Sequence, residues 1–165
     1  MPARGINHVD LTVSDVPRSI DFYEHLPGPL GFGEYDRYPS YRGTEQVVYF
    51  RVGQQFLGLR PADGGEHHYY DVGIEHIAFF VDTRDEVDAA YERCLAIGAD
   101  VQYPPELDRD IPDYYGLFVF DPDGMRVEVA CAPVVDLFDT KPDPSRRSDE
   151  TAPGQEEQPA ESAGS

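Results

Sequence analysis

Apolar and polar positions along the chain predict a strand, a helix and three further strands, and this series occurs twice. Residues 6–13 alternate between apolar and polar side chains, as a strand with one buried face does. Ser14 or Asp15 can cap the helix that follows, with Pro17 near its first turn. Glycines and a proline at 28–31 end that helix. The next three strands are expected near 32–38, 45–52 and 55–60, with a turn at Gly53.

The second series begins with a strand at 74–81 and a helix at 84–97. The helix carries apolar residues at i, i+3 and i+4 spacing, which predicts a buried stripe. The stripe consists of Val87, Ala90, Tyr91, Cys94 and Leu95. Gly98 is expected to end the helix. Strands are expected near 101–104, 115–121 and 125–130, and Asp121-Pro122-Asp123-Gly124 has the composition of a tight hairpin turn. The predicted fold class is α+β, with tandem βαβββ modules at 4–62 and 72–132.

The two modules share an internal sequence repeat. GINHVDLTVSDVPRSIDFY, which starts at Gly5, aligns with GIEHIAFFVDTRDEVDAAY, which starts at Gly73. Both copies open with Gly-Ile-x-His, continue as an apolar strand and lead through a capping residue into a helix. The alignment places His8 and His76 in register, so the two imidazoles are expected at equivalent positions of two similar units.

Three side chains are candidate metal ligands because alternation places each on the more polar face of its strand. His8 and His76 lie on the first strand of each module, and Glu128 lies on the last strand of the second. They point into one cavity if the modules pair edge to edge, within one chain or across a dimer. Two imidazoles and a carboxylate can hold one divalent metal ion, Fe²⁺ or Mn²⁺ in the favoured interpretation and Zn²⁺, Ni²⁺ or Co²⁺ as alternatives. An ion pair with Arg126 is the other way to satisfy Glu128.

Composition narrows the class of protein. The net charge of −19 would repel a phosphate backbone, so no nucleic-acid partner is expected. There is no apolar run of about 18 residues, so no membrane partner is expected either. Two cysteines cannot form a disulfide framework and no secretory leader is visible, which favours a cytoplasmic location. Residues 1–135 are expected to form the folded domain, and 136–165 an acidic disordered tail with few apolar side chains.

These features together resemble the vicinal oxygen chelate superfamily, which includes glyoxalase I, extradiol dioxygenases, fosfomycin-resistance thiol transferases and bleomycin-binding proteins. The resemblance covers about residues 4–132 and rests on the two repeat segments, LAIGA and FDPDGMRVEV. It implies a curved mixed sheet around a metal cup, ligands at His8, His76 and Glu128, a small-molecule substrate and a homodimer. A fourth carboxylate ligand, frequent in the family, would fall at Gly58, which has no side chain to coordinate a metal.

Three further residues are candidates for the site. Tyr115, or its neighbour Tyr114, could face the cavity and hydrogen-bond a substrate oxygen, although strand aromatics also pack structurally. His68 could act as an acid or base, or belong to a polar linker between the modules. Arg126 shares the face of Glu128 and could bind an anionic substrate, or form a structural salt bridge.

The favoured function is a metal-dependent enzyme that chelates its substrate through two adjacent oxygens. The missing fourth ligand favours an extradiol-dioxygenase-like oxidoreductase over a glyoxalase-like lyase or isomerase. Thiol transfer to an epoxide or related antibiotic is a further alternative. A metal-free protein that sequesters a small molecule or antibiotic is the alternative from another class.

Overall fold

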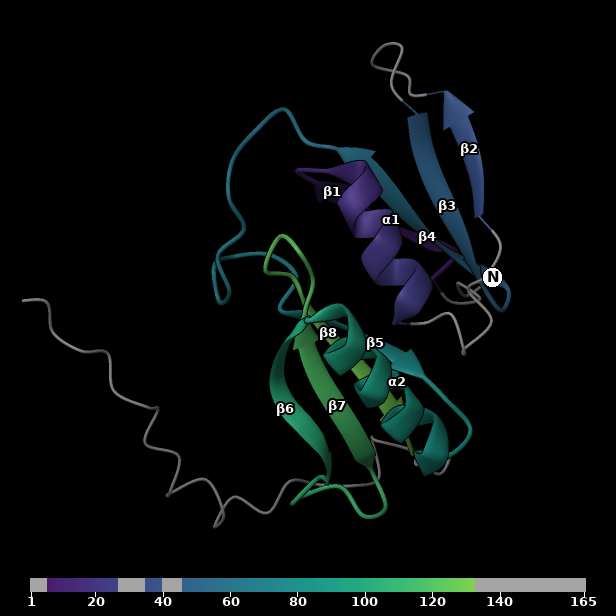
Figure 1. The fold of residues 1–165 in the computed structure, drawn as a ribbon, viewed down its shortest axis with the longest axis vertical. Helices are drawn as coiled ribbons and strands as arrows, with labels where there is room; N and C mark the ends of the chain where they lie inside the picture. Colours follow the sequence, from purple (N-terminus) through teal and green to yellow (C-terminus); the bar gives the residue numbers. More distant parts are fainter. Residues whose placement is uncertain (1–5, 27–34, 40–45, 133–165) are drawn as a thin grey trace, which may run out of the picture. The chain divides into compact units, whose positions relative to one another are not determined.

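Each half of the chain folds into a four-stranded mixed sheet with one helix on it (Figure 1). The computed structural model describes residues 6–26, 35–39 and 46–132. The first half comprises β1 (His8–Val13), α1 (Val16–His25), β2 (Tyr35–Pro39), β3 (Gln46–Val52) and β4 (Gln55–Pro61). The second comprises β5 (His76–Phe80), α2 (Arg84–Ile97), β6 (Asp100–Leu107), β7 (Tyr115–Phe120) and β8 (Arg126–Cys131).

The two sheets have the same topology. Their strand orders are β1-β4-β3-β2 and β5-β8-β7-β6. In each sheet the first and last strands of the repeat pair in parallel, and the remaining neighbours are antiparallel. The predicted α+β class with two βαβββ repeats is therefore confirmed. The expected helix end at 28–31, the start of the strand near 32–38 and the acidic tail at 136–165 lie outside the described residues, so those expectations remain predictions.

Local sequence explains where the helices begin and end. The Asp15 side chain accepts a hydrogen bond from the Arg18 amide (3.1 Å), which satisfies one free N–H at the start of α1. Thr83 and Glu86 form a reciprocal capping box on α2, and Gly98 ends that helix with a φ of 67°. Within the described part of the chain, neither helix is long and apolar enough to cross a membrane.

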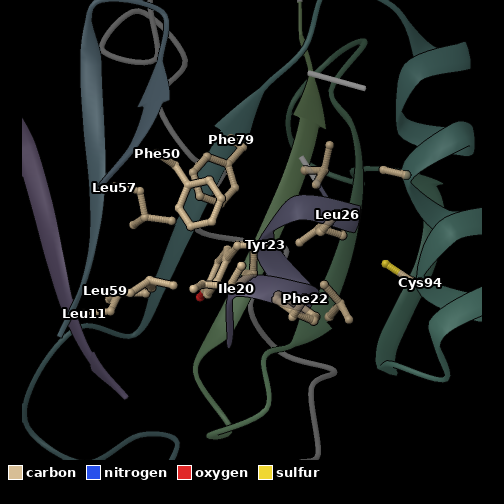
Figure 2. Close-up of a cluster of buried hydrophobic side chains, with 14 of the residues drawn as sticks. Leu11, Ile20, Phe22, Tyr23, Leu26, Phe50, Leu57, Leu59, Phe79 and Cys94 are labelled. Atoms are coloured by element: carbon tan, nitrogen blue, oxygen red, sulfur yellow. The ribbon is translucent and has the colours of Figure 1, made fainter. Parts of the chain in front are cut away.

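One hydrophobic core draws on both repeats (Figure 2). Ile20 and Tyr23 of α1 belong to it together with Phe79 of β5. The predicted stripe of α2 is only partly correct: Val87, Ala90 and Cys94 are fully buried, whereas the Leu95 side chain is 50% exposed. The remaining fully buried large side chains come mostly from the helix-facing sides of the two sheets: Phe50, Leu57, Leu59, Leu117, Val13, Val48, Val119 and Val127.

Polar contacts also join the repeats. The buried Tyr23 hydroxyl of α1 donates to Asp121 Oδ2 (3.0 Å), in the turn between β7 and β8. The Ser14 amide donates to Asp123 Oδ2 (3.0 Å) in the same turn. Burial and the nearby Asp121 charge raise the pKa of Tyr23 well above its ordinary value, so this hydroxyl remains a donor. The Asp-Pro-Asp-Gly turn thus holds the beginning of β8 and the first helix at the same place.

Candidate metal centre

His76 and Glu128 meet on the second sheet. They lie on the parallel neighbours β5 and β8, where Ala78 is directly opposite Glu128. The Nε2 atom of His76 is 3.3 Å from Oε2 of Glu128. The imidazole is 36% exposed and the carboxylate side chain 4% exposed, so the pair combines a donor that solvent reaches with a nearly buried charge.

Glu128 lies in a setting where a cation would stabilise it. Its strand neighbours Val127 and Val129 are fully buried, and its Oε1 accepts a hydrogen bond from the Tyr114 hydroxyl (2.7 Å). Burial raises the pKa of Glu128, and the Tyr114 bond and the charges of His76 and Arg126 lower it only in part. A buried carboxylate with incomplete compensation fits a metal ligand, because coordination supplies the missing positive charge.

The other nitrogen of His76 is also engaged. Its Nδ1 contacts an oxygen of Glu75, and Glu75 Oε1 accepts from Nη1 of Arg126 (2.5 Å). Although burial raises the pKa of Glu75, hydrogen bonds from His76 and Arg126 outweigh that effect and lower it overall. Nη1 of Arg126 also donates to the Tyr69 hydroxyl (2.7 Å), and the guanidinium lies 4.0 Å from the centre of the Phe118 ring. Arg126 is therefore bound to Glu75 rather than to Glu128, the partner that the sequence suggested.

His8 lies on the first sheet, at a cavity of about 560 Å³. Its Nδ1 is 2.9 Å from the Asn7 side-chain oxygen, and its ring meets the Tyr49 ring edge to face at 6.3 Å. The cavity is rich in aromatic side chains and contains one arginine. Its lining consists of Asn7, His8, Tyr35, Asp36, Tyr38, Tyr49, Arg51 and Phe56.

Strand register confirms that Gly58 occupies the position equivalent to Glu128. Asp10 is opposite Gly58 in the β1–β4 pair, as Ala78 is opposite Glu128 in the β5–β8 pair. A Cβ atom at position 58 would overlap Asp10 Oδ1 and approach Tyr49 Cε1 to 2.7 Å. The Asp10 carboxylate thus fills the space that a side chain at 58 would need, and its Oδ2 accepts from Nε of Arg60 (2.5 Å) and from the Tyr49 hydroxyl (3.1 Å).

The three predicted ligands are not assembled by a single chain. Across residues 6–26, 35–39 and 46–132, no group of three or more His, Cys, Asp or Glu side chains could hold a metal ion. His76 and Glu128 form a pair, whereas His8 lies on the other sheet. The donor types nevertheless fit a divalent metal. An oxygen contacts Nδ1 of each imidazole, and the Glu128 carboxylate lies beside Nε2 of His76.

Tyr114 and Tyr115, the two alternatives that the sequence offered, have different hydrogen-bond partners. The Tyr115 hydroxyl donates to Asp88 Oδ1 (2.7 Å) on α2, and Tyr114 donates to Glu128. His68 Nε2 is 3.9 Å from a Glu66 oxygen, and its side chain is 64% exposed. Neither Tyr115 nor His68 has a described contact with His76 or Glu128, so their catalytic roles remain predictions without support from these contacts.

The sequence analysis did not identify Asn7 and Glu75 as candidates, although their equivalent positions in the repeat could have indicated them. Glu75 and Asn7 are equivalent positions of the repeat, each directly before a histidine and each in contact with its Nδ1. Strand alternation also distinguishes the tyrosines: Tyr115 shares its face with the buried Leu117 and Val119, so Tyr114 lies on the face of Glu128.

The tandem βαβββ arrangement, with a histidine at the start of each repeat, is that of the vicinal oxygen chelate class. Residues 5–129 match the Glyoxalase/Bleomycin resistance protein/Dioxygenase superfamily, and the chain belongs to this family. Metallothiol transferase FosB of Shouchella clausii (strain KSM-K16) is 30% identical over 128 residues, which cover 76% of this chain and 78% of that protein. The protein YqjT of Bacillus subtilis (strain 168) is 30% identical over 125 residues, which cover 75% and 96%.

Solved structures show the same fold. A glyoxylase/bleomycin resistance protein/dioxygenase domain from Frankia sp. EAN1pec superposes with a TM-score of 0.64 at 25% identity, covering 81% of this chain and 95% of that domain. The fosfomycin resistance protein FosX of Listeria monocytogenes superposes with a TM-score of 0.60 at 20% identity, covering 81% and 97%. A FosX variant was crystallised with Mn(II) and 1S,2S-dihydroxypropylphosphonic acid, and matches with a TM-score of 0.61 at 19% identity over 81% and 96% of the two chains.

Proposed function

We propose that this chain is a metal-dependent enzyme whose active site forms between two copies, from His8 of one protomer and His76 and Glu128 of the other. The His76–Glu128 pair carries the proposal, because it sets the Nε2 atom of a partly exposed imidazole 3.3 Å from a nearly buried carboxylate. Two neutral nitrogens and one carboxylate leave open coordination positions for a substrate.

The proposed homodimer would supply the metal ligand that one chain lacks at the His76–Glu128 pair. Within the described residues one chain brings together two of the three ligands, and His8 faces a separate cavity. The strand β5 is at the edge of its sheet, and Phe80 on it is 61% exposed on the same face as His76. A second copy that covers this face would bury apolar surface and bring a third ligand to the pair.

Each side chain of the proposed site would have its own role in binding the metal ion or in orienting a ligand. A bound divalent ion, with Fe²⁺ or Mn²⁺ favoured, would act as a Lewis acid toward a substrate oxygen. His8 and His76 would supply neutral imidazole nitrogens, and Glu128 a negative charge that Tyr114 holds in orientation through its 2.7 Å hydrogen bond. Burial of Glu128 keeps water from competing for its second oxygen.

Addition of a nucleophile to a small strained substrate is the reaction that we favour. The relatives named metallothiol transferase FosB support thiol transfer, which replaces the dioxygenase interpretation as the first choice. In this reaction a thiolate sulfur forms a bond to an epoxide carbon, the carbon–oxygen bond breaks, and the released oxygen takes a proton. The glyoxalase-like lyase has less support, because Gly58 offers no second carboxylate and Asp10 beside it is bound to Arg60.

The extradiol-type dioxygenase is the second candidate, on one specific observation. The cavity beside His8 is lined by three tyrosines and Phe56, which suits a flat aromatic ring better than a small epoxide. Arg51, whose guanidinium lies 5.3 Å from the centre of the Phe56 ring, could bind an anionic substituent of such a ring.

Mixing two inactive variants tests the shared site. His8→Ala and Glu128→Ala should each bind Mn²⁺ poorly, and unfolding and refolding them together should restore about a quarter of the wild-type sites, since half of the random dimers then hold one intact site. Metal content after gel filtration is the measurement. Absence of restoration, with dimers present, contradicts a site shared between copies, and a wild-type protein that binds no divalent metal supports the metal-free binding protein instead.

Two assays separate the reaction classes. Loss of L-cysteine thiol in the presence of fosfomycin and Mn²⁺ supports transfer, whereas oxygen uptake with catechols and Fe²⁺ supports the dioxygenase. The Glu128→Ala variant is the control for both, because it should lose either activity. A metal-loaded protein that is inactive in both assays contradicts both reaction classes.

A further inference from the structure

Both candidate histidine ligands receive a side-chain oxygen from the residue directly before them. Asn7 Oδ1 is 2.9 Å from Nδ1 of His8, and a Glu75 oxygen contacts Nδ1 of His76. The contact recurs at the same position of both repeats, Asn-His in one and Glu-His in the other. A neutral imidazole carries one N–H, and an acceptor oxygen at Nδ1 holds that hydrogen there and leaves the Nε2 lone pair free.

We infer that Asn7 and Glu75 are positioning residues, which hold His8 and His76 in the Nδ1–H tautomer so that each Nε2 is available to the metal. This inference rests on the metal site proposed above. It assigns Glu75 and Asn7 a role in ligand orientation, which metal-binding histidines commonly obtain from a carboxylate or carbonyl group.

The role of Glu75 follows from a competition for one proton. His76 lies between two carboxylates, with Glu75 at Nδ1 and Glu128 at Nε2. If the hydrogen were on Nε2, it would be donated to Glu128 and the nitrogen could not coordinate a metal. The Glu75 oxygen offers the alternative acceptor and therefore selects the tautomer that binds.

Arg126 holds Glu75 in the position that this role requires. Its Nη1 donates to Glu75 Oε1 (2.5 Å) and to the Tyr69 hydroxyl (2.7 Å), and its side chain is only 12% exposed. The Phe118 ring centre, 4.0 Å from the guanidinium carbon, fixes the guanidinium from one side. Arg126 is thus a support for Glu75, as in the salt-bridge alternative that the sequence left open, and its substrate-binding role remains a prediction.

The two repeats should differ in how strongly they hold the ligand. Glu75 is charged, partly buried and anchored by Arg126, whereas Asn7 is neutral and exposed. Hydrogen bonds to charged acceptors are stronger than those between neutral groups. His76 is therefore the more firmly oriented ligand and His8 the more adaptable one.

Long-range ¹H–¹⁵N NMR of the metal-free full chain, at about pH 9, above the model-peptide histidine pKa of about 6.5, tests the inference directly. Wild-type His8 and His76 should both show the Nδ1–H pattern. Glu75→Met, which keeps the length of the side chain and removes the acceptor, should shift His76 to the Nε2–H pattern and leave His8 unchanged. Asn7→Leu should affect His8 alone.

Metal titration gives the second readout. Glu75→Met should weaken Mn²⁺ binding about 10–100-fold, the range known for such supporting groups. Glu75→Gln restores a neutral acceptor like that of Asn7, and should recover the Nδ1–H pattern with intermediate affinity. Glu66→Met is the matched control, since Glu66 is an exposed carboxylate beside His68 and neither readout should change.

The outcomes separate this inference from the proposed function. An unchanged His76 pattern in Glu75→Met overturns the positioning role even if the wild type binds metal well. A wild-type chain without metal affinity, in which Glu75→Met still changes the tautomer, overturns the metal site and leaves the positioning role intact. If Glu75→Met fails to fold, Asn7→Leu decides by the same NMR pattern, because it removes the equivalent acceptor from His8.

Discussion

The two repeats share one topology and one register, yet they place their carboxylates on opposite strands. In the first repeat Asp10 of β1 is opposite Gly58, and in the second Ala78 of β5 is opposite Glu128. Asp10 is neutralised by Arg60, whereas the side-chain contacts of Glu128 are a tyrosine hydroxyl and an imidazole. One scaffold thus carries a carboxylate that is ion-paired with an arginine through Oδ2, and a second carboxylate whose charge is only partly compensated by its neighbours.

The largest expected difference between the repeats is in metal affinity. Glu128→Gln should weaken Mn²⁺ binding by more than about 100-fold, because it removes a charged ligand rather than a supporting group. Asp10→Asn should change it less than about threefold, since Asp10 Oδ2 is ion-paired with Arg60 and this carboxylate is not one of the proposed ligands. Isothermal titration of both variants measures the contrast, and similar losses in the two would show that Asp10 is a ligand after all.

A larger side chain at position 58 should have the next largest effect, on the free energy of unfolding. Gly58→Ala should lower the free energy of unfolding by about 1–3 kcal/mol, because the new methyl group overlaps Asp10 and crowds Tyr49. The double variant Asp10→Ala, Gly58→Ala should recover part of that loss, measured by urea unfolding. If the two losses simply add, Asp10 does not fill the space next to residue 58.

Much of the fold and of the candidate metal centre could be predicted from the sequence, because each strand and helix of one repeat has an equivalent in the other repeat that supports its prediction. The repeat located every described strand and helix to within a few residues, placed His8 and His76 in register and identified Gly58 as the equivalent of Glu128. The repeat could not show which copy of the chain supplies each ligand, because the apolar and polar pattern of one chain does not indicate how two copies associate. The exposed Leu95 was wrongly assigned to the core because helical spacing alone does not locate the edge of the buried stripe.

The tyrosine pair at the start of β7 offers a smaller contrast. Tyr114→Phe leaves a buried Glu128 oxygen without its donor and should cost about 1 kcal/mol of stability, with a measurable loss of metal affinity. Tyr115→Phe breaks only an exposed bond to Asp88 and should change either quantity little. Thermal unfolding and Mn²⁺ titration test both, and equal effects would contradict the assignment of Tyr114 to the site.

The smallest expected effect concerns acidity in the metal-free protein. Burial holds the pKa of folded Glu128 above its ordinary value of 4.5, so between the unfolded and folded pKa values the native state binds more protons. The contribution of this residue to stability is therefore present below 4.5 and is lost as the pH rises through the raised folded pKa. Glu128→Gln should stabilise the metal-free protein near neutral pH by about 0.5 kcal/mol. An unfolding series against pH should show the two proteins converging in acid, and a constant offset would contradict the burial argument.

The contact between α1 and the Asp-Pro-Asp-Gly turn limits how repeats can be exchanged between relatives. Consider a chimera that keeps the first repeat and takes the second repeat from a relative. The Tyr23 hydroxyl then has its hydrogen-bond acceptor only if the relative carries an aspartate at the position of Asp121. Without it, the buried hydroxyl would lose its partner at a cost of about 1–3 kcal/mol. Recombination within this family should therefore succeed most often when that helix and that turn are inherited from the same parent.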